Sequence, residues 1–61
     1  MTTREREVAR LVARGLTSRQ IAEALVVTEM TAANHVQHVL DKLEVHSRNQ
    51  LAARAAEFGL V

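Results

Sequence analysis

The 61-residue chain has no cysteine, no proline, no tryptophan and no tyrosine, and it has only two glycines and one phenylalanine. Without cysteine, no disulfide can form and no thiolate can bind zinc. Few aromatic residues and many alanines favour helices over strands. A chain this short buries only about 60% of its unfolded surface on folding. Its core must therefore come from well-matched helices.

Other absences bear on where the protein acts and what it binds. No apolar run approaches the roughly 20 residues that span a bilayer, and no basic-then-apolar signal segment is present. We therefore expect a cytoplasmic protein with no membrane partner. Eight Lys and Arg residues against seven Asp and Glu residues give a net charge of only +1. That balance is weak evidence for a nucleic-acid partner, which usually requires a basic surface.

Four serine or threonine residues stand where helices would begin. Thr2, Thr17 and Ser47 are each followed three residues later by Glu or Gln, which is the spacing of a capping box. Thr28 is a plain N-cap, and glycines 15 and 59 are placed to end the first and last helices. These patterns predict helices over residues 3–14, 18–25, 29–43 and 48–58.

The apolar residues of each predicted helix recur at i, i+3 and i+4. We predict an all-α, compact four-helix domain that occupies residues 1–61 as a single unit. The expected core residues are Val8, Leu11, Val12, Leu16, Ile21, Ala22, Leu25, Ala32, Val36, Val39, Leu40, Leu43, Leu51, Ala52, Ala55 and Phe58.

The second and third predicted helices form the most informative unit. The second is only about two turns long, and residues 26–28 leave a three-residue connection to the longer third helix. Two helices joined this tightly are typical of a helix-turn-helix. We expect Val27 to pack inward and fix the angle between them.

The face of the third helix opposite Val36 is polar and carries few charges. It is centred on Asn34 and surrounded by Met30, Thr31, Gln37, His38 and Asp41. Asparagine and glutamine can pair with adenine through two hydrogen bonds, and Thr or Met can contact a thymine methyl group. A face that is merely solvated would usually carry more Lys and Glu. The pattern therefore favours a face that binds in the major groove of DNA.

The residues also resemble a known family. The chain is similar to the LuxR-type, or FixJ- or GerE-type, helix-turn-helix domain over nearly its whole length. The similarity is carried by Arg4-Glu5-Arg6-Glu7-Val8, Leu11, Gly15, Thr17-Ser18-Arg19-Gln20-Ile21-Ala22, Leu25, Val27-Thr28, Thr31-Ala32, His35-Val36, Lys42-Leu43, Val45 and Ser47-Arg48. It implies a response-regulator-like bacterial transcription regulator whose third helix recognises DNA.

The resemblance also implies roles for single residues. Asn34 and Gln37 are expected to contact bases, together with Met30 and Ala33 on the same helix. The expected contacts to the DNA backbone are Thr17, Ser18, Arg19, Thr28, Thr31, His35, His38, Lys42 and Arg48. Family members usually carry Lys at position 33 and often a cation at position 37. Since both positions are neutral here, we expect weaker binding that depends less on salt.

The resemblance further implies a homodimer formed through the fourth helix, where Ala53 and Ala56 form a small-residue surface behind the core face. Alanine is also simply a good helix former. RNA polymerase is a further candidate partner. The sequence starts almost at the first helix cap. This start is what we expect of a fragment of a longer protein, in which a sensory domain, a receiver domain or a large ATPase-type regulator lies upstream.

Catalysis and metal binding find no support. His35 and His38 are too few to hold zinc without cysteine, so we expect no metal and no cofactor. No Ser or Thr stands in a recognisable His–carboxylate arrangement, and we expect no enzyme. Two alternatives remain open: a promoter-recognition module like sigma factor region four, which also docks on RNA polymerase, and a helical bundle that binds another protein.

Overall fold

The computed structural model describes residues 2–60, which form four helices and no strand. Helix α1 spans Thr3–Ala13, α2 spans Ser18–Leu25, α3 spans Glu29–Lys42 and α4 spans Arg48–Ala53. The predicted all-α fold is confirmed. The first three helices end within one residue of their predicted bounds, whereas α4 is five residues shorter than predicted. No helix in this range is long and apolar enough to cross a membrane.

Side-chain caps begin all four helices. The Thr2 hydroxyl accepts a hydrogen bond from the Glu5 backbone N–H at 3.2 Å, and Glu5 Oε1 accepts one from the Thr2 N–H at 2.9 Å. Thr17 and Gln20 form the same reciprocal pair at the same distances. Two of the three predicted capping boxes are therefore present, and each satisfies two donors that the helix itself leaves free.

The third predicted capping box is wrong in one half. Ser47 does accept a hydrogen bond from the Gln50 N–H at 3.1 Å. The Gln50 side chain, however, accepts from the N–H of His46 at 2.6 Å. Gln50 thus reaches one residue further back than a box requires, at a cap whose φ of −156° differs from the −74° and −77° of Thr2 and Thr17.

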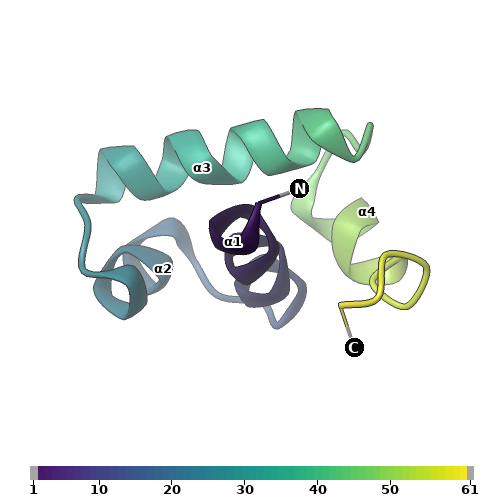
Figure 1. The fold of residues 1–61 in the computed structure, drawn as a ribbon, viewed down its shortest axis with the longest axis horizontal. Coiled ribbons are helices and arrows are strands. Elements are labelled where there is room, and N and C mark those ends of the chain that lie inside the picture. The colour runs from purple at the N-terminus through teal and green to yellow at the C-terminus, as the bar shows by residue number, and fades with distance from the viewer. Residues whose placement is uncertain (1, 61) are drawn as a thin grey trace.

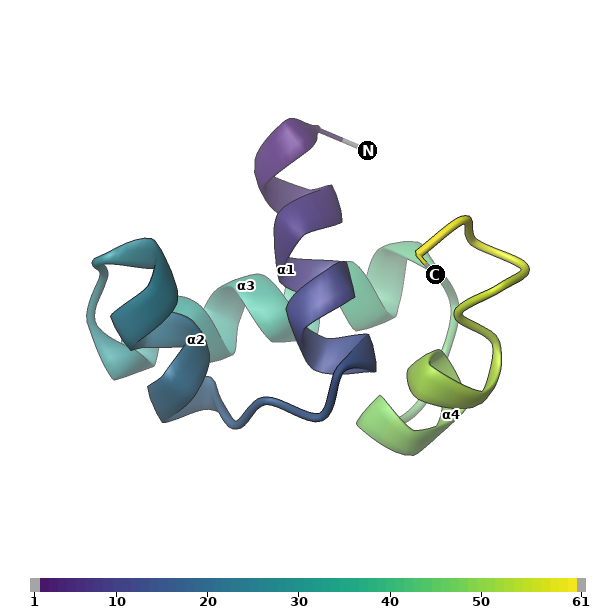
Figure 2. The ribbon, with the colours of Figure 1, turned by 90° about the horizontal axis from the view of Figure 1, so that it is seen from below.

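The helices are arranged so that α3 runs along one side of the molecule. Figure 1 shows α2, α1 and α4 packed beneath it in that order, and Figure 2 shows that α1 crosses α3. α3 contacts both α2 and α1, and α1 also contacts α4. The buried core comprises Val8, Ala9, Val12, Ile21, Ala22, Ala32, Val36, Val39, Leu40, Val45, Leu51, Ala55 and Leu60.

The C-terminal segment departs most from prediction. After Ala53 the chain makes tight turns, in which Glu57 N donates to Arg54 O and Phe58 N donates to Ala55 O. These i→i+3 bonds replace the α-helical pattern and bring Leu60 back into the core, where it is 7% exposed. Ala56 therefore lies outside α4, and Ala52, predicted in the core, is exposed. Helix propensity favoured a longer helix, but burial of Leu60 overrides it.

Candidate nucleic-acid interface

The helix-turn-helix is formed by α2, residues 26 and 27, the Thr28 cap and α3. Val26 ends α2 in the left-handed conformation, with φ of 57°. Val27 N then donates to Ala22 O at 3.0 Å, and the Val27 side chain packs against the core. The inward packing predicted for Val27 is confirmed. Because Val26 itself is 90% exposed, burial does not explain its unusual backbone.

One face of α3 is exposed over its length, and we call it the exposed polar face. It consists of Met30, Ala33, Asn34, Gln37, His38 and Asp41, which are all exposed. Met30 is 76% exposed, which is unusual for a large apolar side chain. The four predicted base-contacting residues all belong to this face. The fold thus brings them together on one exposed surface.

The amides on this face differ in their partners. Gln37 Nε2 donates to Asp41 Oδ1 at 2.9 Å, one helical turn later. Asn34 forms no side-chain hydrogen bond within the described range, residues 2–60. The Gln37 amide nitrogen carries two hydrogens and gives one to Asp41, so that bond fixes the direction of the amide, whereas no such bond fixes the Asn34 amide within residues 2–60. Asn34 is therefore the better placed of the two for direct base contact.

The predicted backbone-contacting residues surround this face. Thr31, His35, His38 and Lys42 form one flank of α3, at about 100° per residue around its axis. Thr28 and Thr31 are linked at the start of α3 by a hydrogen bond of 2.8 Å between their hydroxyl groups. Thr17, Ser18 and Arg19 lie instead at the start of α2, where Thr17 is the cap.

Arg48 has an internal role that the sequence did not reveal. Its side chain is partly buried, and Nη1 donates to the carbonyl oxygen of Leu16 at 3.0 Å. Nη2 donates to the hydroxyl of Ser18. The first residue of α4 is thus tied to the first residue of α2 and to the loop before it. A contact between Arg48 and DNA would have to share or break these bonds.

Lys42 is also engaged, since its Nζ lies 3.1 Å from both carboxylate oxygens of Glu5 in α1. The backbone hydrogen bond from Thr2 and, next, the bond from Lys42 lower the pKa of Glu5 from its ordinary value of 4.5 to about 2. Glu5 therefore stays ionised throughout the physiological range. The lysine that was predicted to contact phosphate is paired with a permanent negative charge.

The remaining charges are distributed unevenly. α3 carries one cation, Lys42, against two carboxylates. Arg19, at the start of α2, lies 3.6 Å from Glu23. By contrast, Arg6, Arg10 and Arg14 are exposed and form no ion pair within residues 2–60. We call these three residues the arginine stripe.

The arginine stripe faces away from the core. Its members recur every four residues, as Val8 and Val12 do on the buried side, and at about 100° per residue the two sets point about 180° apart. Figure 2 shows α1 in front of α3 when the molecule is seen from below. The stripe and the exposed polar face of α3 thus lie on different sides of the molecule.

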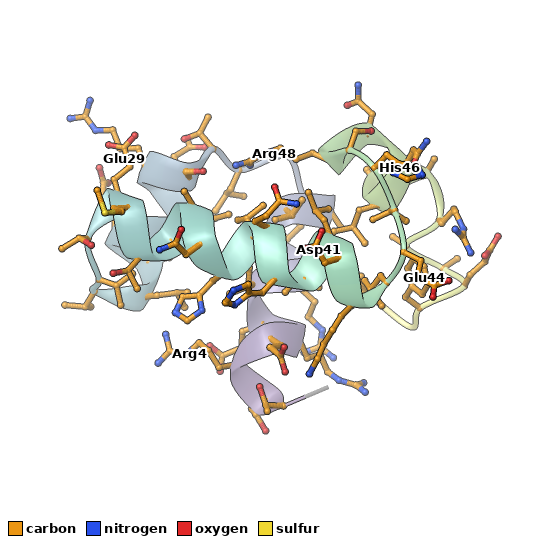
Figure 3. All side chains as sticks on the ribbon, turned by 90° about the horizontal axis from the view of Figure 1, so that it is seen from above. Arg4, Glu29, Asp41, Glu44, His46 and Arg48 are labelled. Atoms are coloured by element: carbon orange, nitrogen blue, oxygen red, sulfur yellow. The ribbon has the colours of Figure 1, made fainter. Side chains whose placement is uncertain are left out.

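Arg4 is a candidate that the sequence did not single out. Figure 3 shows Arg4 and Arg48 on opposite sides of α3, with Asp41 between them on the exposed side. Arg4 is exposed and forms no ion pair in the described part of the chain. In the sequence it stands in an alternating Arg-Glu run that is typical of a solvated surface, and only the crossing of α1 and α3 places it beside α3.

Residues 2–60 contain no cluster of three or more His, Cys, Asp or Glu side chains that could hold a metal ion.

Comparison with known proteins places this arrangement in context. Residues 1–55 match the family described as bacterial regulatory proteins, luxR family. The transcriptional regulatory protein DegU of Brevibacillus brevis is 39% identical over 61 residues, which are 100% of this chain and 26% of that protein. The transcriptional regulatory protein LnrK of Bacillus subtilis is 40% identical over 60 residues, 98% of this chain and 27% of that protein.

The nitrate/nitrite response regulator protein NarL of Escherichia coli is 42% identical over 52 residues, which are 85% of this chain and 24% of that protein. The chain thus spans about a quarter of the length of these relatives.

Proposed function

Because the chain belongs to the luxR family of bacterial regulatory proteins, we propose that residues 1–61 form one helix-turn-helix domain that binds duplex DNA in a sequence-specific manner. Membership of a family of transcription regulators implies DNA binding. The element that recognises bases and the oligomeric state are our own inferences. We infer that α3 enters the major groove and that the domain serves transcription regulation in the cytoplasm, without catalysis.

The observation that supports this function best is the exposed polar face of α3. A helix fits in the major groove when the surface it presents is narrow and bears groups that match base edges. Asn34 lies at the centre of this face and has no competing partner within residues 2–60. Met30, 76% exposed, is suited to contact a thymine methyl group.

The residues around this face are suited to position the domain on phosphates, as most polar contacts to DNA do. Thr31, His35, His38 and Lys42 lie along one flank of α3, and the start of α2 supplies hydroxyl groups and the exposed Arg19. We add Arg4 to this set. Two rows of backbone contacts on either side of a helix match the two strands that border the groove.

We propose that Asn34→Ala weakens binding to the preferred duplex by about 1–3 kcal/mol, the contribution of a paired amide to base discrimination. The preferred duplex would first be selected from a random pool. Affinities for that duplex and for a scrambled duplex would then be measured by fluorescence anisotropy at one salt concentration.

Asn49→Ala is the matched control, because Asn49 is an exposed asparagine of α4, away from α3. It should leave both affinities nearly unchanged. If Asn34→Ala weakened binding to both duplexes equally, Asn34 would be a backbone contact and its proposed role would be wrong.

We further propose that two copies bind DNA together through the region of α4, with Ala53 and Ala56 at the contact. Both alanines are exposed, although Ala56 lies in the turns that follow α4. A dimer would recognise two half-sites about one helical turn of DNA apart. Sedimentation of the chain with and without the selected duplex measures this state. RNA polymerase remains a candidate partner at the promoter.

A further inference from the structure

The ion pair between Lys42 and Glu5 connects the recognition helix to α1. Lys42 is the only Lys or Arg residue of α3, and Glu5 lies 37 residues earlier in the sequence. Both carboxylate oxygens lie 3.1 Å from the ammonium nitrogen. The positive charge at the end of α3 is therefore neutralised by a contact that exists only because α1 packs against α3.

Glu5 is the fixed partner in this pair. Its side chain is 18% exposed, whereas that of Lys42 is 54% exposed on a flexible stem. The Thr2 N–H also holds Glu5 Oε1 at 2.9 Å. A phosphate could draw Lys42 away, but Glu5 would remain beside it as a negative charge.

The other ion pair of the helix-turn-helix, between Arg19 and Glu23, is more exposed to solvent than the pair between Lys42 and Glu5. Arg19 and Glu23 lie 3.6 Å apart, and their side chains are 79% and 72% exposed. Such a solvated pair contributes little, and Glu23 can turn into solvent when Arg19 meets a phosphate. Glu5 cannot do so without breaking the α1 cap. The structure therefore singles out Glu5.

We propose that Glu5 is a positioning residue that lowers the DNA affinity of this domain, by neutralising Lys42 and by holding a carboxylate near the phosphate that Lys42 would contact. The proposal rests on the proposed function, because it requires DNA on the exposed polar face of α3. Removing the charge of Glu5 should therefore strengthen DNA binding, although it also removes an internal ion pair.

Glu5→Gln tests this inference because glutamine can maintain the helix cap. At the equivalent position of α2, Gln20 accepts the Thr17 N–H at 2.9 Å, the same distance as in the Thr2–Glu5 bond. Glu7→Gln is the matched control. It makes the same change two residues later, at an exposed residue that forms no ion pair within residues 2–60.

Binding of the 61-residue chain to a random-sequence duplex would be measured by fluorescence anisotropy at several salt concentrations. At about 100 mM salt, Glu5→Gln should bind about two- to fivefold more tightly than the wild-type protein. The slope of log affinity against log salt should become steeper by up to about 0.9, since one more phosphate is neutralised. Glu7→Gln should change both quantities much less.

Lys42→Gln completes the test, because in that background Glu5→Gln should keep only the part of its advantage over Glu7→Gln that comes from removing a carboxylate near the phosphate. If Glu5→Gln bound DNA no more tightly than Glu7→Gln, while circular dichroism showed that both variants are folded, the proposed role of Glu5 would be wrong. A wild-type chain that binds no duplex even at low salt would instead contradict the proposed function. The two failures are therefore distinguishable.

Discussion

At the scale of single residues, Glu5 connects two distant parts of the fold. Its carboxylate caps α1 through the Thr2 N–H and also binds Lys42 of α3. The sequence predicted the cap, because the spacing of Thr2 and Glu5 is local. It could not predict the ion pair, which depends on how two distant helices cross. The same holds for Arg48, whose bonds to Leu16 and Ser18 span about half the chain.

The lowered pKa of Glu5 predicts how stability depends on pH. The folded-state pKa of about 2 lies below the ordinary value of 4.5, so ionised Glu5 stabilises the fold above about pH 4.5. That contribution should be lost as the pH falls from 4.5 to 2. Glu5→Gln should therefore be less stable than the wild-type protein at pH 7, and the difference in Tm should shrink toward pH 2.

Thermal unfolding followed by circular dichroism at pH 7, 4 and 2 measures this trend. Glu7→Gln is again the control, since its difference from the wild-type protein should not narrow in the same way. A Tm difference between Glu5→Gln and the wild-type protein that stayed constant over this range would contradict the assigned contacts of Glu5.

At the scale of elements, some helix ends could be predicted from the sequence and others could not. The three threonine caps and Gly15 were predicted from local patterns, and the structure contains all of them. Val26 and Glu44 were not predicted, although they take the same left-handed conformation as Gly15. Valine is a poor residue for this conformation. Val26 lies in the turn between α2 and α3, which pack against each other, so its conformation accompanies a tertiary contact that no local pattern reveals.

Val26→Gly should therefore stabilise the protein by about 0.5–1 kcal/mol. Glycine relieves a backbone cost of about 1–2 kcal/mol, part of which is offset by the greater freedom of the unfolded chain. Because Val26 is 90% exposed, the substitution removes little packing. Urea unfolding of the variant measures the change.

Gly15→Ala is the complementary variant. Gly15 has φ of 88° and open space around the position of an added Cβ, so alanine should destabilise the fold by about 1 kcal/mol through the backbone alone. Destabilisation by Val26→Gly would show that the Val26 side chain has a packing role that its exposure does not suggest.

The fourth helix shows where local reasoning fails. The alanine-rich segment 52–56 favours a continuous helix by propensity, yet the structure ends α4 at Ala53. Leu60 reaches the core only through the tight turns that follow. A predicted helical surface containing both Ala53 and Ala56 was therefore wrong in its geometry, while their role between two copies of the chain stays a prediction.

At the scale of the whole molecule, most of the positive charge that forms no ion pair within residues 2–60 lies away from the exposed polar face, and Arg4, beside α3, is the exception. Lys42 is paired, Arg19 has an acidic neighbour and Arg48 is bonded internally. The unpaired arginine stripe lies on the outer side of α1. Composition alone could reveal the small net charge, but not this separation, because it depends on how the helices pack. The separation provides a way to distinguish base recognition by α3 from simple attraction between DNA and arginine.

The most direct test of DNA recognition through α3 is an NMR titration of the chain with its selected duplex, followed through the backbone amide shifts. Binding through the exposed polar face should change the signals of Asn34, Gln37 and residues 17–19 most strongly, and those of the arginine stripe little. Changes centred on Arg6, Arg10 and Arg14, with α3 unaffected, would contradict recognition through α3.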